Sequence, residues 1–386
     1  MASILGFVRR VSKIASPPSV PKNEGALKFG ILGAAAIGPE ALIKPARSHA
    51  DVVIYAVAAR DKARAQEYAD KHGITKVHDS YQDLLDDPEI DVVYNPLPNG
   101  LHFEWTAKAL LAGKHVLLEK PATDTAEEAR ALFELAEKQG RVLLEAFHYR
   151  FHPAIRRLKE IILSQELGNV KSITTSLAIP KQAFGDDDIR YNHALGGGAQ
   201  MDVGGYTLNA LRYLASPSQE TAVNPLEVLS ASSITYLDPK IDRRTTATFS
   251  FPNDIVGTAI CDFQIGWLDF LTGNAIYASV ECEGGKIDMA NFLLPTIWHS
   301  INVKPKGGKV RTEKVYTPLD GAPGEEWWTT YRYQLETFVN RVKGRDSGPV
   351  WIEKEDTLGN MEWIERVYAK TELGSRPASQ FKVPTV

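Results

Sequence analysis

The pattern of hydrophobic and polar positions changes partway along the chain. Before Pro153, short β-branched runs alternate with helical stretches. Val52–Ala58 (VVIYAVA) is apolar at nearly every position, which is typical of a strand buried on both faces of a sheet. Strands are expected at 27–32, 52–58, 91–94, 115–118 and 142–145, and helices at 61–72, 103–112 and 126–139. This alternation predicts an α/β domain with a parallel, doubly wound sheet.

After Pro153 the pattern becomes rich in strands. One helix is expected at 154–165, strands at 170–179, 228–236, 245–251, 256–263 and 275–282, and a closing amphipathic helix at 354–371. Because little helix lies between these strands, we expect an open and mainly antiparallel sheet. The predicted organisation is an N-terminal extension (1–26), an α/β domain (27–150) and an α+β domain (151–386).

Composition and charge favour a small-molecule substrate. The 44 basic and 48 acidic residues give a formal net charge of −4, so no broad basic field favours nucleic acid or anionic lipid. Cys261 and Cys282 are the two cysteines and form no metal-binding motif with histidine, so neither a zinc site nor a disulfide scaffold is expected. No apolar run approaches the ~20 residues that span a bilayer. We expect no membrane or nucleic-acid partner, no metal, and a cytoplasmic location.

The first 22 residues carry several basic and serine residues and no acid before Glu24. This composition fits either a mitochondrial presequence or a short amphipathic helix that lies on the body and ends at Pro17-Pro18. The second interpretation is preferred.

A glycine-rich turn directly follows the first strand. The segment GAAAIG fits G-x-G-x-x-G with alanine in place of the second glycine; its expected cofactor contacts are Gly33, Ala35, Ile37 and Gly38. Small residues there permit a tight turn, close approach to a pyrophosphate and close packing of the following helix. In an alternating β/α context this predicts a Rossmann dinucleotide-binding domain.

The end of the second strand indicates which dinucleotide binds. An NAD-selective domain usually has an acid there, whereas this chain has Arg60, with Arg64 one helical turn beyond. A guanidinium matches a 2′-phosphate through two hydrogen bonds, so NADP is the expected cofactor. Asp61 is expected to cap the helix that follows.

Three further segments fall where loops should meet at the carboxyl ends of strands. Pro96 and Pro98, just after the strand at 91–94, form a rigid loop, the proline ledge, that suits the face of a nicotinamide. The expected cofactor contacts in and beside this ledge are Asn95, Pro96, Leu97, Asn99 and His102. Glu119-Lys120-Pro121 follows another strand, and Glu119 and Lys120 are further expected cofactor contacts. Gly196–Gly198 precedes a helix on which Asp202 and Tyr206 share one face. A tyrosine hydroxyl titrates near ~10, so a nearby lysine ammonium would bring it closer to the working range of a base.

These motifs, together with Glu145–Pro153 (EAFHYRFHP), resemble the glucose–fructose oxidoreductase / inositol dehydrogenase / rhizopine-catabolism protein (Gfo/Idh/MocA) family. Tyr206 and Val57–Ile74 are most similar to the branch of dimeric dihydrodiol dehydrogenases and fungal D-xylose dehydrogenases. The resemblance implies that Lys120 and Tyr206 form the catalytic pair, and that the open sheet makes a homodimer. His148 and Asn95 stand where family members vary.

We therefore expect an NADP-dependent oxidoreductase that acts on a sugar or cyclic diol. Tyr206 would take the hydroxyl proton, and Asp202 would orient the substrate or Lys120. Residues expected to recognise substrate are His148, Arg150, Arg190, His193 and Tyr206. An aldose oxidised at its anomeric carbon ranks first, and a trans-dihydrodiol or a dicarbonyl reduced in reverse ranks second. A protein of another class, which binds NADP for regulation without catalysis, remains an alternative.

Overall fold

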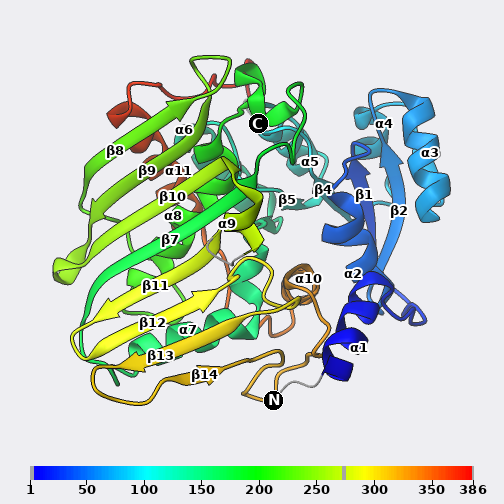
Figure 1. Ribbon diagram of the computed structural model, residues 1–386. Helices are drawn as coiled ribbons and strands as arrows, with labels where there is room; N and C mark the ends of the chain where they lie inside the picture. Colours follow the sequence, from blue (N-terminus) through cyan, green and yellow to red (C-terminus); the bar gives the residue numbers. More distant parts are fainter. Residues whose placement is uncertain (1–3, 272–274, 385–386) are drawn as a thin grey trace.

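The computed structural model describes residues 4–271 and 275–384; the first three residues of the predicted extension lie outside these ranges. It contains two sheets (Figure 1). The smaller sheet has six parallel strands in the order β3-β2-β1-β4-β5-β6. Its strands are β1 (Leu27–Leu32), β2 (Val52–Ala58), β3 (Lys76–His78), β4 (Val92–Asn95), β5 (His115–Leu118) and β6 (Leu143–Glu145). The predicted doubly wound sheet is confirmed.

The strand order changes direction between β1 and β4, which are paired neighbours: β2 and β3 are added on one side of β1, and β4, β5 and β6 on the other. At such a point the loops after two adjacent strands diverge and leave a crevice outside their carboxyl ends. The helices of this part are α2 (Lys44–Arg47), α3 (Lys62–His72), α4 (Tyr81–Asp86), α5 (His102–Leu111) and α6 (Ala126–Gln139).

The larger sheet has eight strands in the order β14-β13-β12-β11-β7-β10-β9-β8. Their bounds are β7 (Val170–Pro180), β8 (Glu227–Thr235), β9 (Asp242–Ser250), β10 (Val256–Ile265), β11 (Ile276–Cys282), β12 (Gly285–Ala290), β13 (Ser300–Pro305) and β14 (Arg311–Glu313). All neighbours are antiparallel except β7 and β10, which run parallel. The mainly antiparallel prediction is confirmed with that one exception.

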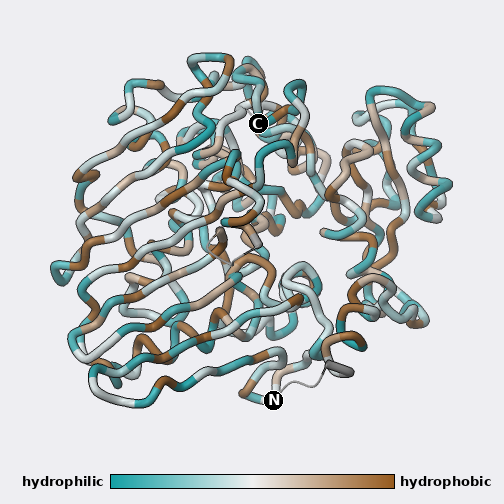
Figure 2. Tube along the Cα trace, in the orientation of Figure 1, coloured by the Kyte–Doolittle hydropathy of each residue, from teal (hydrophilic) through white to brown (hydrophobic). Residues whose placement is uncertain are grey.

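Helices cover one face of the large sheet, and Figure 1 shows its other face turned toward the viewer. The helices of this part are α7 (Pro153–Leu163), α8 (Gly205–Ala215), α9 (Trp267–Leu271), α10 (Thr330–Val342) and α11 (Lys354–Lys370). Along these strands hydrophobic and hydrophilic residues alternate (Figure 2), and in β12 buried and half-buried positions alternate one by one. This period of two is expected of a sheet with one face on the core.

The N-terminal segment folds as helix α1 (Ile4–Ala15), as the preferred interpretation predicted. Its Arg10 is buried, donates from Nε to the carbonyl oxygen of Thr296 at 2.8 Å, and lies 3.7 Å from the ring centroid of Tyr316. One arginine thus docks the helix on the body. No helix in the described ranges is long and apolar enough to cross a membrane.

Candidate active site

A cavity of about 960 Å³ lies between the two sheets. The loops after β1, β2, β4 and β5 line one side of it, and residues of β7, the 184–206 segment, the 293–294 turn and α10 line the other. Both halves of the molecule therefore contribute to the site.

The glycine-rich turn lines the cavity through Gly33 and Ala34–Ile37. Gly33 has φ +88°, and a Cβ atom there would lie 3.0 Å from Leu97 Cδ2. This turn therefore requires glycine at its first position. Gly38 is buried outside the lining of the cavity, and a Cβ atom there would meet the Tyr68 hydroxyl of α3 at 2.3 Å.

Arg60 and Arg64 are exposed and line the cavity beside the glycine-rich turn. Asp61 caps α3 by accepting from the amides of Ala63 and Arg64, and Arg64 Nη2 donates to the carbonyl oxygen of Ala34 at 3.3 Å. Because the Asp61 carboxylate caps the helix, this role does not involve the Arg60 guanidinium, which can face a ligand. Two guanidinium groups next to a tight backbone turn fit a dinucleotide with a third phosphate, as in NADP.

The proline ledge is held by Asn95 and His102. Asn95 is buried outside the lining of the cavity, and its Nδ2 donates to Thr106 Oγ1 at 3.0 Å. The His102 ring nitrogens lie 2.8 Å and 2.7 Å from the carbonyl oxygens of Pro121 and Leu97, so this ring joins the ledge to the loop of Lys120. Burial lowers the pKa of His102 to about 4. Pro96, Leu97, Asn99 and His102 line the cavity.

Lys120 and Asp202 form an ion pair across the cavity, and Lys120 Nζ also donates to the carbonyl oxygen of Asp202 at 3.3 Å. The second carboxylate oxygen of Asp202 accepts from Arg190 Nε at 2.6 Å. Burial alone would raise the pKa of Asp202, but Lys120 and Arg190 hold it well below its usual range. Glu119 accepts from the Tyr94 hydroxyl at 2.7 Å, and burial raises the pKa of Glu119.

Tyr206 lies next to this pair, with Lys120 Nζ 5.0 Å from its ring centroid. The rings of Phe147, His148 and Tyr149 surround it at centroid distances of 5.5, 5.5 and 6.0 Å. Burial raises the pKa of Tyr206 well above its usual value, and nearby Tyr331, Glu119 and Asp202 act in the same direction. We expected Lys120 to lower this pKa. The structure differs because the ammonium pairs with Asp202 and burial dominates at the phenol, so the resident form at neutral pH is the neutral phenol.

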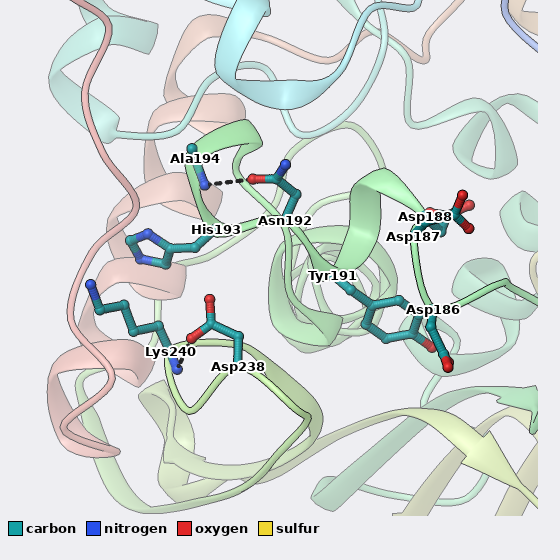
Figure 3. Close-up of a pocket in the computed structure, with 9 residues that line it drawn as sticks. All are labelled: Asp186, Asp187, Asp188, Tyr191, Asn192, His193, Ala194, Asp238 and Lys240. Atoms are coloured by element: carbon teal, nitrogen blue, oxygen red, sulfur yellow. Dashed lines mark hydrogen bonds between the residues drawn. The ribbon is translucent and has the colours of Figure 1, made fainter.

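The residues predicted to recognise substrate are divided between three places. His148 and Arg190 line the cavity. Arg150 is fully buried away from it and pairs with Asp356 at 2.9 Å. His193 lines a separate outward pocket of about 450 Å³ (Figure 3). Asp188 lines both the cavity and this outward pocket.

Sequence reasoning missed Tyr331 and an apolar wall. Tyr331 lies in α10, and its ring contacts His148 with centroids 3.9 Å apart and the planes tilted by 33°. Thr330 Oγ1 lies 2.7 Å from His148 Nδ1, and burial lowers the pKa of His148 to about 3, which keeps the ring neutral. The wall consists of Leu177, Ile179, Phe184, Val203, Leu293 and Leu294. No motif marks these residues; only the alternation along β7 hinted that Leu177 and Ile179 share a face.

Comparison with known proteins agrees with this geometry. Residues 27–147 match the model described as "Oxidoreductase family, NAD-binding Rossmann fold", and residues 155–281 match the GFO/IDH/MocA C-terminal domain. D-xylose 1-dehydrogenase (NADP(+)) 2 of Haloferax volcanii is 33% identical over 359 residues, which cover 90% of this chain and 98% of that protein. Trans-1,2-dihydrobenzene-1,2-diol dehydrogenase of Sus scrofa is 30% identical over 305 residues, covering 78% and 83%.

Among solved structures, a 3-ketoreductase from Actinomadura kijaniata in complex with NADP and TDP-benzene has a TM-score of 0.77 at 23% identity, covering 89% of this chain and 98% of that one. This likeness shows the fold. The family models, the extent of the identity and the shared architecture lead to one conclusion: the chain belongs to the Gfo/Idh/MocA family of oxidoreductases.

Proposed function

We propose that this protein is an NADP-dependent dehydrogenase that oxidises a CH–OH carbon, with an aldose of the D-xylose type, converted to its lactone, as the first candidate substrate. The observation that carries the proposal is the placement of Lys120, Asp202 and Tyr206 in the same cavity as Arg60 and the glycine-rich turn. The relative from Haloferax volcanii, similar over nearly its whole length, supports the sugar.

Different residues of the chain bind the cofactor and transfer the proton. The turn at Gly33 and the Arg60 guanidinium bind the dinucleotide, and the ledge braced by His102 supports its reactive end. NADP⁺ supplies the acceptor for the hydride. In the oxidation the deprotonated form of Tyr206 takes the proton of the substrate hydroxyl, and in the reduction the neutral phenol returns it. Lys120, fixed by Asp202, places a positive charge beside the substrate oxygen. Positioned proton transfer of this type contributes about 10²–10⁴-fold to a rate.

A second candidate substrate is a trans-dihydrodiol, or a dicarbonyl reduced with NADPH. The apolar wall favours it, because Leu177, Phe184 and Leu293 offer no partner to a sugar hydroxyl. A buried hydroxyl without a partner costs roughly 1–3 kcal/mol. The relative from Sus scrofa is consistent with such a substrate.

The proposal extends to the assembly. We propose a cytoplasmic homodimer formed through the open face of the large sheet, with residues 27–150 and 151–386 as the two domains. Sedimentation of the purified protein measures the dimer directly, and a monomer at micromolar concentration would contradict it.

The test is formation of NADPH with D-xylose, D-glucose, myo-inositol and a trans-dihydrodiol, repeated with NAD⁺. Turnover of a pentose or hexose with preference for NADP⁺ supports the first candidate, and turnover of the diol alone supports the second. Tyr206→Phe should lose about 10²–10⁴-fold in kcat, whereas Tyr277→Phe, on strand β11 outside the cavity, should not. Tight NADPH binding with no turnover of any substrate would contradict the enzyme and favour the regulatory alternative.

A further inference from the structure

The segment that carries Asp202 and Tyr206 begins directly after three glycines. It starts as a π-helix at Gln200–Gly204 and continues as α8. The amide of Gln200 donates to Asp242 Oδ2 at 2.7 Å, and Asp242 is fully buried at the start of β9. A carboxylate from the large sheet therefore fixes the first residue of this helix.

Arg376, from the segment that follows α11, binds both Asp242 and the backbone just before this helix, and the three together are called the anchor. Its Nη2 pairs with Asp242 Oδ1 at 3.0 Å, and its Nε donates to the carbonyl oxygen of Gly197 at 2.6 Å. The guanidinium also lies 4.0 Å from the ring centroid of Tyr368, whose hydroxyl donates to Asp242 Oδ1 at 2.8 Å. Arg376 and Asp242 have 0% side-chain exposure. The pair therefore acts without competition from solvent.

The glycine run is explained by this packing. A Cβ atom at Gly198, whose φ is +126°, would lie 2.4 Å from both Arg376 Nη2 and Asp242 Oδ1. A Cβ atom at Gly197 would lie 2.5 Å from the carbonyl oxygen of Arg190. Gly198 thus admits the guanidinium to the backbone just before the catalytic helix, and Gly197 admits the carbonyl oxygen of Arg190.

The same C-terminal segment continues onto the parallel-sheet part of the molecule. The amide of Ser379 donates to Glu128 Oε1 of α6 at 2.6 Å, and the Phe381 ring packs against Phe103 of α5 with centroids 6.3 Å apart. The segment therefore bridges the two parts whose facing residues, Lys120 and Asp202, form the catalytic ion pair.

We propose that Arg376 is a positioning residue for the catalytic helix, through which the C-terminal segment holds Asp202 and Tyr206 in register with Lys120. Arg376 lies outside the cavity, so it acts through the backbone at Gly197 and through Asp242. The inference rests on the proposed dehydrogenase function. Loss of the anchor should shift Asp202, two residues beyond Gln200, and a misplacement of about 1 Å can cost roughly 10²-fold in rate.

The test compares Arg376→Met and Arg376→Lys with Arg130→Met, a control whose arginine forms an exposed surface pair with Glu362. Rates are divided by the concentration of NADPH-binding sites, so that unfolded protein does not lower the apparent kcat. We expect kcat to fall about 10–100-fold in Arg376→Met, with partial recovery in Arg376→Lys and unchanged NADPH affinity in both. Unchanged kcat per site in both Arg376 variants would overturn the proposal.

A second readout does not need the activity. Amide hydrogen exchange over residues 198–206 should accelerate in the Arg376 variants, while exchange in β2 stays as in the wild type. If the wild type turns over no substrate, the dehydrogenase proposal fails and this exchange measurement still decides the positioning role. Exchange over 198–206 equal to that of the wild type would overturn it. Should Arg376→Met fail to fold, Arg376→Lys carries both measurements.

Discussion

The ammonium of Lys120 forms its ion pair with the carboxylate of Asp202, from the opposite part of the molecule, while its charge lies above the ring of Tyr206. Asp202 in turn holds Arg190, so one carboxylate stands between two cations. The carboxylate therefore determines where the Lys120 charge lies relative to the ring of Tyr206.

Replacing Asp202 by asparagine should impair both stability and turnover. Lys120 would then lose its ion-pair partner, while Arg190 would keep its pair with Asp188 at 3.0 Å. Breaking a buried pair costs about 3–5 kcal/mol, and because these side chains are partly exposed we expect a loss near the lower end of that range. Denaturant unfolding and kcat measure the two effects. Asp288→Asn, in a surface pair with Lys304, is the matched control and should leave both unchanged; an equal loss in the two variants would contradict the role of Asp202.

The raised pKa of Tyr206 predicts a different pH dependence for the two directions of the reaction. In the free enzyme the phenol holds its proton through the neutral range, because burial disfavours the phenolate. We expect kcat/KM for oxidation to keep rising toward about pH 10, since that quantity reports the free enzyme. Reduction with NADPH should stay level from about pH 6 to 9, because the acid form is already present. A plateau for oxidation that begins near neutral pH would show that Lys120 lowers the pKa after all.

Asp124 gives a separate, pH-dependent contribution to stability. Both of its carboxylate oxygens are buried without a hydrogen-bond partner among the described residues, and burial, reinforced by Glu128, raises its pKa to about 7. The folded state therefore holds a proton that the unfolded state, with a pKa of 3.8, has released. Its stabilising contribution is present below about pH 4 and is lost as the pH rises through about 7.

Asp124→Asn should remove this dependence. At about pH 4 and below the free energies of unfolding of the variant and the wild type should be close, and at about pH 9 the variant should be more stable, by up to about 4 kcal/mol. Glu145, whose pKa burial raises to about 8, is present in both proteins and cancels in the difference. Asp70→Asn, on the exposed surface of α3, is the control. A difference that does not grow with pH would contradict an uncharged Asp124.

The buried, structural position of Arg150 could not be predicted from the sequence. It lies among aromatic residues in a motif near the cavity, so a role in substrate recognition was a reasonable prediction. Its partner Asp356 is 206 residues away, and its guanidinium lies 3.7 Å from the ring centroid of Tyr213. Nothing local in the sequence marks an arginine that will be buried by such a distant carboxylate.

More of the fold than of the site could be predicted from the sequence. β1 and β2 have the predicted bounds, because short, mostly apolar runs flanked by polar or glycine residues need no tertiary information. Strands β12–β14 and helix α10 were missed; GKIDMA and SINVKP do alternate apolar and polar positions, but both are short, and RTE has no apolar residue. Tyr331 was missed with α10, because its place beside His148 depends on packing rather than on a motif.

Replacing Arg150 by methionine should therefore act on stability rather than on recognition. Methionine has a similar length but leaves Asp356 with Arg212 as its remaining buried cationic partner, and breaking such a pair costs about 3–5 kcal/mol. We expect a lower free energy of unfolding with unchanged KM in the protein that remains folded. A raised KM without loss of stability would return Arg150 to the substrate site.

The cofactor preference depends on Arg60, which follows the last residues of β2 and is exposed beside the turn at Gly33. Each charge-assisted hydrogen bond contributes about 1.5–3 kcal/mol, so Arg60→Ser should weaken NADPH binding by about 10–100-fold. NADH lacks the 2′-phosphate, so its affinity should stay the same, and fluorescence titration measures both. The control is Lys62→Met, because Lys62 is also exposed but pairs with Asp79 outside the cavity. Equal losses for NADPH and NADH in Arg60→Ser would mean that this arginine supports the turn rather than reads the phosphate.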